Sequence, residues 1–147
     1  MRNKLLAVLL TVPLLGVSTG VLAQSPVGTW TTIDDETGRP KSVVEIYRAG
    51  DGSLAGRVNE VLQSEQGPDP VCDQCPGERR DQPVEGMEIL WGISRNGEVW
   101  DGGKILDPAS GKIYSVRLKP IEAGSKLEVR GFIGFSLLGR TQTWVRQ

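Results

Sequence analysis

Residues 113–119 read Ile113-Tyr114-Ser115-Val116-Arg117-Leu118-Lys119, and this stretch decides the fold class. Apolar and polar side chains alternate along it, so Tyr114, Val116 and Leu118 fall on one face of an extended chain. The polar residues between them fall on the opposite face. An alternation with a period of two predicts a β-strand that buries one face and exposes the other to water.

The same pattern recurs on both sides of this stretch. Residues 126–130 repeat it, with Leu127 and Val129 opposite the charged side chains. Short β-prone runs alternate with turn sequences rich in glycine, proline and aspartate, such as residues 49–52 and 107–111. We predict eight strands, which span residues 28–34, 42–48, 53–63, 85–93, 98–106, 112–119, 126–133 and 140–146.

One of these runs, residues 53–63, also fits a helix. Leu54, Val58, Val61 and Leu62 form an apolar stripe at helical spacing. Gly56 in the middle of the run, and the turn that precedes it, favour a strand.

Eight short strands joined by tight turns predict an all-β architecture. We expect a single eight-stranded antiparallel up-and-down barrel, because closure of a sheet removes the edge strands that would otherwise aggregate. Packing as two sheets is the alternative. An eight-stranded barrel is also about the smallest that holds one small ligand.

The composition excludes several classes of function. The 147-residue chain carries 17 Lys+Arg against 18 Asp+Glu, which offers no basic field for nucleic acid. It has no histidine, which removes Ser-His-Asp and Cys-His catalysis and histidine metal ligands. No pair of acidic residues stands out as a catalytic pair. We therefore expect a protein that is not an enzyme and that needs no metal and no cofactor.

The first 23 residues have the pattern of a secretory signal peptide. Arg2 and Lys4 precede an uncharged, leucine-rich run, and residues 21–23 read Val-Leu-Ala, with small residues where a signal peptidase cuts. We expect cleavage after Ala23, a barrel domain over residues 24–147, and a periplasmic or secreted protein with no membrane span after cleavage.

Cys72-Asp73-Gln74-Cys75 lies in the longest irregular segment, residues 64–83. A structural disulfide is favoured, since the exported protein reaches an oxidising compartment and the surrounding prolines make the loop turn-like. Three other interpretations remain. A redox site lacks a helix start after Cys75, a zinc site would need further ligands, and covalent haem attachment lacks the following histidine.

Aromatic and charged residues on the predicted strands are candidates for a ligand pocket, where aromatic side chains meet a few polar groups. Glu45 lies between Val44 and Ile46 and would be a buried acid if it pointed inward, although an outward, solvated position is favoured because buried glutamates are rare. A packed core is the alternative role for the tryptophans. The candidate ligand-binding residues are Trp30, Glu45, Tyr47, Arg57, Trp91, Trp100, Lys104, Tyr114, Arg130 and Phe132.

Two resemblances follow from these residues. Gly28-Thr29-Trp30 on the first strand, followed by a meander with a basic residue on the last strand, resembles the lipocalin and calycin architecture. That resemblance implies that Arg146, or Arg140, packs over Trp30 at one end of the barrel. Nearly the whole mature chain resembles a bacterial exported family, domain of unknown function 2147, which implies a lipocalin-like barrel and no established activity. The segments that carry this second resemblance are residues 28–30, 41–46, 72–75, 86–90, 102–108, 110–114, 127–134 and 139–144.

Two functions are compatible with this sequence. The first is binding of a small apolar or amphipathic molecule inside the barrel. The second is a protein-binding module, an envelope stress factor or an inhibitor, that presents the Cys72–Cys75 loop to an envelope protein partner. The apolar segment 132–138 is compatible with both, because it would either line the barrel or form an exposed contact surface.

Overall fold

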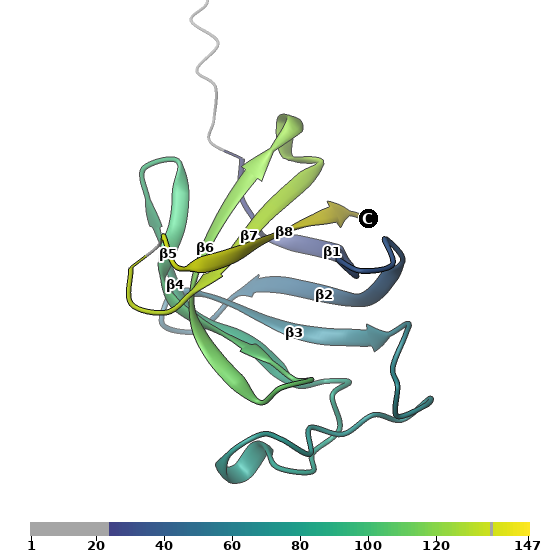
Figure 1. Cartoon of the computed structure of the whole chain (residues 1–147). Coiled ribbons are helices and arrows are strands. Elements are labelled where there is room, and N and C mark those ends of the chain that lie inside the picture. The colour runs from purple at the N-terminus through teal and green to yellow at the C-terminus, as the bar shows by residue number, and fades with distance from the viewer. Residues whose placement is uncertain (1–23, 136) are drawn as a thin grey trace, which may run out of the picture.

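The computed structural model describes residues 24–135 and 137–147, and shows one antiparallel sheet that closes on itself (Figure 1). The predicted signal peptide, residues 1–23, lies outside the described residues. Consecutive strands pair as neighbours around the barrel from the first to the eighth. The predicted all-β, eight-stranded up-and-down barrel is therefore confirmed.

Each predicted run of alternating residues forms a strand, including residues 54–61, for which a helix was the alternative. A one-turn 3₁₀ helix, η1 (Gly77–Arg79), lies in the long β3–β4 loop, and a second, η2 (Glu122–Gly124), joins β6 to β7. The strands are β1 (Gly28–Ile33), β2 (Pro40–Arg48), β3 (Leu54–Val61), β4 (Glu88–Asn96), β5 (Val99–Asp107), β6 (Lys112–Ile121), β7 (Lys126–Phe132) and β8 (Gly139–Arg146).

The fourth strand starts and ends three residues later than predicted. Gly86 has a positive φ of 85°, and the Met87 N–H donates to the Val84 carbonyl at 3.1 Å, so a turn occupies the predicted strand start. At the other end Asn96 pairs with Val99, so only Gly97 and Glu98 form the hairpin turn. Gly97 supplies the positive φ, 66°, that such tight turns require.

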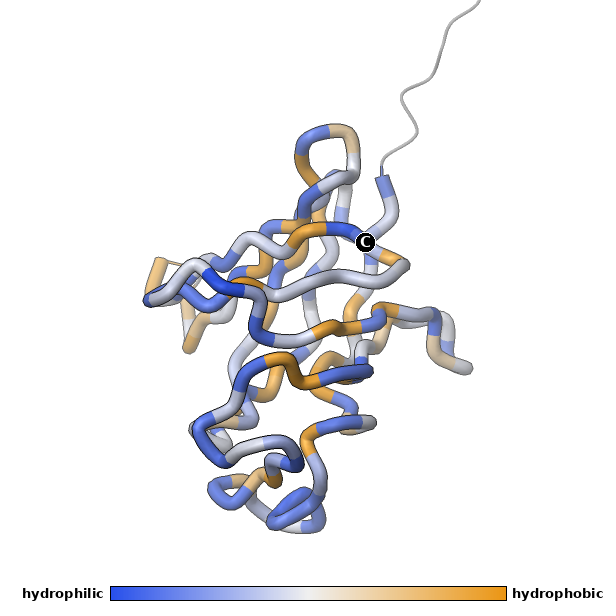
Figure 2. The backbone as a smooth tube through the Cα atoms, turned by 90° about the vertical axis from the view of Figure 1, so that its right-hand side faces the viewer, coloured by the Kyte–Doolittle hydropathy of each residue, from blue (hydrophilic) through white to orange (hydrophobic). Residues whose placement is uncertain are grey.

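Strands β1 and β8 close the barrel through a short ladder in which Trp30 pairs with Arg146 and Thr31 with Val145. Inside, the core follows the alternation of the sequence. Val116 and Leu118 on β6 are fully buried, as is Leu127 on β7. Figure 2 shows the resulting pattern, in which short hydrophobic segments interleave with polar ones along the strands.

No helix among the described residues is long and apolar enough to cross a membrane.

Candidate functional site

The two ends of the barrel differ, and one of them is sealed. Trp30 is fully buried there and donates its indole N–H to the Pro26 carbonyl at 2.8 Å. The Arg146 guanidinium lies over the Trp30 ring, as the lipocalin resemblance implied for Arg146 or Arg140. Arg146 also donates to the carbonyls of Gly124, Val27 and Ser25 at 2.7, 2.9 and 2.9 Å. These side chains and residues 25–27 thus cover this end of the barrel.

The opposite end, where the β1–β2, β3–β4, β5–β6 and β7–β8 loops lie, opens into a cavity of about 340 Å³. This volume is at the lower limit of the roughly 300–1,000 Å³ typical of ligand pockets. Most of the wall is apolar, and a smaller polar group of side chains lies near the loops. The apolar lining includes Ile89, Ile105, Leu106, Val129, Phe132 and Trp144, and the polar lining comprises Thr32, Lys41, Ser42, Asp107, Tyr114, Arg140 and Gln142.

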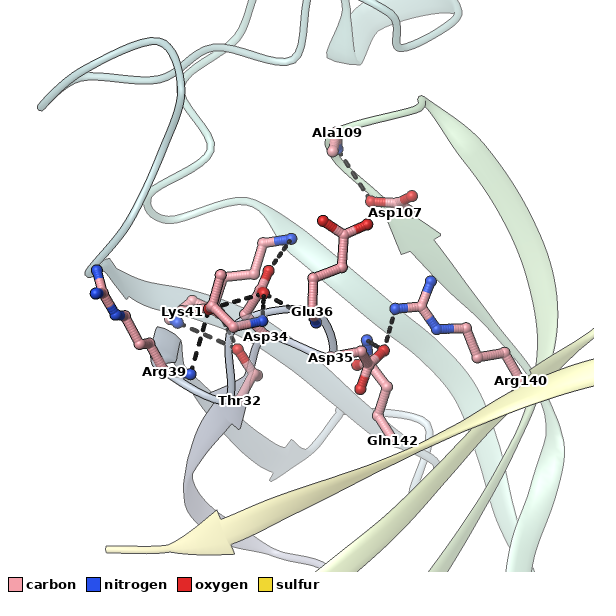
Figure 3. Close-up of polar contacts among 12 residues, drawn as sticks. Thr32, Asp34, Asp35, Glu36, Arg39, Lys41, Asp107, Ala109, Arg140 and Gln142 are labelled. Atoms are coloured by element: carbon pink, nitrogen blue, oxygen red, sulfur yellow. Dashed lines mark hydrogen bonds and ion pairs between the residues drawn. The ribbon is translucent and has the colours of Figure 1, made fainter.

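A chain of hydrogen bonds leads from the buried wall of this cavity to its rim. Trp144, 2% exposed, donates its indole N–H to Gln142 Oε1 at 3.2 Å. Gln142 Nε2 in turn donates to Asp35 Oδ2 at 3.0 Å, and Arg140 donates to the same oxygen (Figure 3). Asp35 raises the pKa of Arg140 above its already high ordinary value, so this guanidinium stays charged. The rim of the cavity therefore has a fixed polar arrangement.

The loop that carries Asp35 is held by its neighbour Asp34. Asp34 Oδ1 accepts hydrogen bonds from the backbone N–H groups of Thr37 and Glu36, at 2.7 and 3.1 Å, and from the Thr37 hydroxyl at 2.9 Å. Such an arrangement is typical of an aspartate that starts a turn. The bonds from Thr37 are the main reason that the pKa of Asp34 is lowered.

Two hydroxyl groups add polarity to the wall between β1 and β2. The hydroxyls of Thr32 and Ser42 lie 2.8 Å apart, and the Ser42 N–H donates to Thr32 Oγ1 at 3.1 Å. Lys41 lies beside them and forms an ion pair with Asp34 at 3.8 Å. A ligand in the cavity would meet these groups after passing the rim.

Two of the ten residues that the sequence suggested as ligand-binding, Tyr114 and Phe132, line this cavity. Two others are buried elsewhere: Trp30 at the sealed end and Trp100, 6% exposed, in the core. They have the alternative role that the sequence left open for tryptophan, which is filling the interior.

The remaining six lie on the outer surface of the barrel. Glu45 pairs with Arg57 at 2.9 Å, so it has the outward position that the rarity of buried glutamates favoured. Arg57 also lies over the ring of Tyr47, whose hydroxyl donates to Glu88 at 3.0 Å. Burial first, and the bond to Glu88 second, raise the pKa of Tyr47.

The other three outer residues each contact a neighbour on the surface. Lys104 Nζ donates to Ser115 Oγ at 3.1 Å, Arg130 donates to Thr141 Oγ1 at 2.9 Å, and Arg79 lies over the ring of Trp91 at 4.7 Å. A ligand-binding role for these residues stays a prediction. None of them lines the mouth cavity.

Sequence reasoning missed most of the polar lining, namely Thr32, Lys41, Ser42, Asp107 and Gln142. It named Arg140 only as an alternative partner for Trp30. What these residues share is their position in the fold. Each lies on a strand within three residues of a loop at the mouth end, or on the same strand face as Trp144. This position indicates a cavity-lining residue only after the open end of the barrel is known.

The cysteines form the predicted disulfide in the β3–β4 loop, with 5.3 Å between the Cα atoms. Both are fully buried. Cys72 exchanges backbone hydrogen bonds with the far side of the loop, donating to Gln82 and accepting from Asp81, both at 2.9 Å. A shallow groove of about 740 Å³ lies beside this stapled loop, lined by residues of η1 and by the segment that leads into β4. In residues 24–135 and 137–147, no group of three or more Cys, Asp or Glu side chains is placed to hold a metal ion.

Comparison with known proteins adds a family and a fold. A family model described as "Uncharacterized protein conserved in bacteria (DUF2147)" matches residues 28–146. A search of curated proteins gave no match. Among solved structures, this barrel is similar to protein HP1028 from Helicobacter pylori, described as belonging to the lipocalin family. The TM-score is 0.72 at 21% sequence identity, over 84% of each chain, so the likeness concerns the fold.

Proposed function

The chain belongs to the DUF2147 family and folds as a lipocalin-like barrel, and from this premise we propose that it binds one small apolar or amphipathic molecule in the mouth cavity. The observation that carries the proposal is the cavity itself: about 340 Å³, open at one end, with an apolar wall and a hydrogen-bonded polar rim. Pockets that bind small molecules combine these features.

The lining suggests how such a molecule would lie. Trp144, Phe132 and Ile105 would contact an apolar tail, and transfer of that tail from water would supply most of the affinity. The hydroxyls of Thr32 and Ser42 would hydrogen-bond a polar head group, as would Gln142 after exchanging a partner. The small volume admits one acyl chain, whose end would extend through the open mouth, or one ring system.

We further propose that the protein works outside the cytoplasm, in the periplasm or after secretion. The support is the pattern of residues 1–23 together with a disulfide in the mature domain, since disulfides persist in oxidising compartments. We also propose that the protein is not an enzyme. Its polar groups at the mouth are engaged with one another, in the pairs Asp35–Arg140 and Asp34–Lys41, rather than poised around a nucleophile.

A second candidate function is protein recognition through the Cys72–Cys75 loop. The observation that favours it is the groove beside the loop, whose lining includes Pro76, Glu78, Arg79 and Glu85. A disulfide-stapled loop loses little conformational entropy when it binds, which favours recognition by a pre-ordered surface.

Native mass spectrometry of the mature protein, purified from the cell envelope without reductant, tests the first proposal. We expect a discrete extra mass that dissociates on denaturation. Because an exchangeable ligand can be lost during purification, the same sample is then titrated with cis-parinaric acid, a polyene fatty acid whose fluorescence rises in an apolar site. Absence of both the extra mass and saturable probe binding would overturn small-molecule binding and leave protein recognition as the better candidate.

A further inference from the structure

The loop between β7 and β8 exposes an unusual amount of apolar surface. Ile133, Phe135, Leu137 and Leu138 are 65%, 79%, 88% and 69% exposed. Every other large hydrophobic side chain classed as exposed in the described part of the chain lies between 38% and 43%. Large apolar side chains concentrated at one exposed place usually mark a contact with another molecule or with a membrane.

This loop is also a wall of the mouth cavity. Ile133 and Leu138 line the cavity, whereas Phe135 and Leu137 do not. The loop is closed at its base by a hydrogen bond from the Ile133 N–H to the Leu138 carbonyl, at 3.1 Å. Apolar surface therefore continues from the outer side of the loop across its base into the cavity.

We infer that Ile133, Phe135, Leu137 and Leu138 of the β7–β8 loop dock the barrel, mouth first, onto a lipid surface. The biological purpose of this docking rests on the proposed function. A sparingly soluble ligand could pass between the lipid and the cavity along apolar side chains without crossing water. The docking itself follows from the exposed loop and does not depend on the identity of the ligand.

The size of the patch favours lipid over a protein occupant. The four side chains belong to one short loop, whereas a standard protein–protein interface takes about 20–30 residues and ~800 Å² from each partner. A second copy of this chain that paired only through this loop would therefore form a weak contact. Insertion among lipid chains needs no complementary partner surface, and its strength grows with the apolar area that is buried.

Three of the four loops at the mouth carry balanced charges. The β1–β2, β5–β6 and β7–β8 loops and the strand residues beside them carry equal numbers of cationic and anionic side chains. These are Arg39, Lys41, Lys112 and Arg140 against Asp34, Asp35, Glu36 and Asp107. The fourth, the β3–β4 loop, contacts the β5–β6 loop between Cys72 and Pro108 and carries six acidic side chains against two arginines. Docking should therefore be driven by apolar burial, and at low salt it should be weaker on anionic vesicles than on neutral ones.

Co-sedimentation with lipid vesicles tests the inference on the mature chain, residues 24–147. The vesicles are phosphatidylcholine alone, or phosphatidylcholine with an equal part of phosphatidylglycerol. We compare the natural sequence with F135S/L137S, which changes two loop residues outside the cavity lining. The matched control is V27S/V145S, which removes two exposed apolar side chains far from the mouth. We expect F135S/L137S to partition about tenfold more weakly or worse, and the control to partition as the natural sequence does.

Equal partitioning of F135S/L137S and the natural sequence overturns the inference, as does failure of the natural sequence to bind either vesicle. Sedimentation equilibrium without vesicles tests whether the loop binds a second copy of this chain instead. If the natural sequence is a dimer and F135S/L137S is a monomer, the loop is a dimer contact and the inference is overturned. Titration with cis-parinaric acid in the absence of vesicles separates this inference from the proposed function. If neither protein binds the probe but the loop-dependent partitioning remains, docking stands and small-molecule binding in the cavity fails.

Discussion

The guanidinium of Arg146 lies over the indole ring of Trp30, with 4.2 Å between Cζ and the ring centroid. The two side chains come from the strands that close the barrel, and they are paired residues in that closing ladder. They cover the end opposite the cavity. Four predictions follow from the sealed end, the cavity, the stapled loop and the rim.

Replacing Arg146 by methionine should destabilise the fold. The variant loses the contact with Trp30 and leaves the carbonyls of Gly124, Val27 and Ser25 without their donor. We expect the free energy of unfolding to fall by about 2–4 kcal/mol in urea denaturation. Lys119→Met, an exposed substitution of similar size, should change it by less than about 0.5 kcal/mol. Equal stability of the two variants would mean that the sealed end does not depend on this arginine.

Replacing Gly131 by leucine should block the cavity without harming the fold. A Cβ at this position would meet the cavity-lining side chains of Tyr114 and Ile105 at 3.6–3.8 Å, which is ordinary contact. We expect the dissociation constant for cis-parinaric acid to rise about tenfold or more, because the side chain occupies much of a small cavity. The midpoint of thermal unfolding should stay unchanged or rise, because the glycine that is replaced weakens the strand.

Gly50→Leu is the matched control for Gly131→Leu. It adds the same side chain at an exposed turn where nothing lies within 4 Å of the new Cβ. This control should bind the probe as the natural sequence does. If Gly131→Leu also binds normally, the probe does not occupy the mouth cavity.

Reducing the Cys72–Cys75 disulfide should lower the free energy of unfolding by about 2 kcal/mol at most. The bond closes a loop with a sequence separation of three, for which the loss of chain entropy is worth about 2 kcal/mol. We expect a correspondingly small shift of the urea midpoint on adding reductant, with the far-ultraviolet circular dichroism of the barrel retained, because the loop lies outside the eight strands. Protein taken from the cell envelope should resist thiol alkylation until it is reduced. Full alkylation without reductant would contradict a structural disulfide.

Asp34 should make stability depend on pH in the acid range. Hydrogen bonds from Thr37 lower the pKa of Asp34 in the folded protein below its ordinary value of 3.8. A carboxylate with a depressed pKa contributes stability that is fully present above the unfolded value and is lost as the pH falls through the folded value. We therefore expect Asp34→Asn to lower the thermal midpoint at neutral pH, and the difference to close below pH 3.8.

Asp73→Asn serves as the control, because Asp73 lies exposed in the stapled loop. Its thermal midpoint should follow that of the natural sequence across the same range. A difference for Asp34→Asn that persists unchanged into strong acid would show that the carboxylate charge is not the stabilising feature.

The strands were predictable because their signal is local. Leu127 and Val129 alternate with charged residues, and any chain with that order buries one face of a strand. The outward position of Glu45 was favoured for a different reason, since buried glutamates are rare. The positions of Trp91 and Trp100 were not predictable from the local sequence. Both lie on the β4–β5 hairpin, yet Trp91 lies under Arg79 on the surface and Trp100 lies in the core.

A register shift on β5 changes the alternation after Trp100. The pairing of β5 with β6 shifts between Trp100 and Gly103. Gly103 permits a close approach of the two strands of the hairpin, because a Cβ there would collide with the Trp91 carbonyl and with Ile93. A glycine in a strand is compatible with a bulge. The local sequence does not indicate, however, which side chains change from one face of the sheet to the other as a result.

The closed barrel and the disulfide were favoured on other grounds, namely the removal of edge strands and the oxidising compartment. The order of apolar and polar residues along the chain was enough for the number of strands and their antiparallel succession. Those features depend on neighbours in sequence, through a period of two and short turns. The cavity and the exposed loop beside it depend on residues far apart in the chain, such as Asp35, Tyr114 and Trp144. Only closure of the sheet brings these residues to one end, and only the packing of side chains there decides how much of the barrel remains empty.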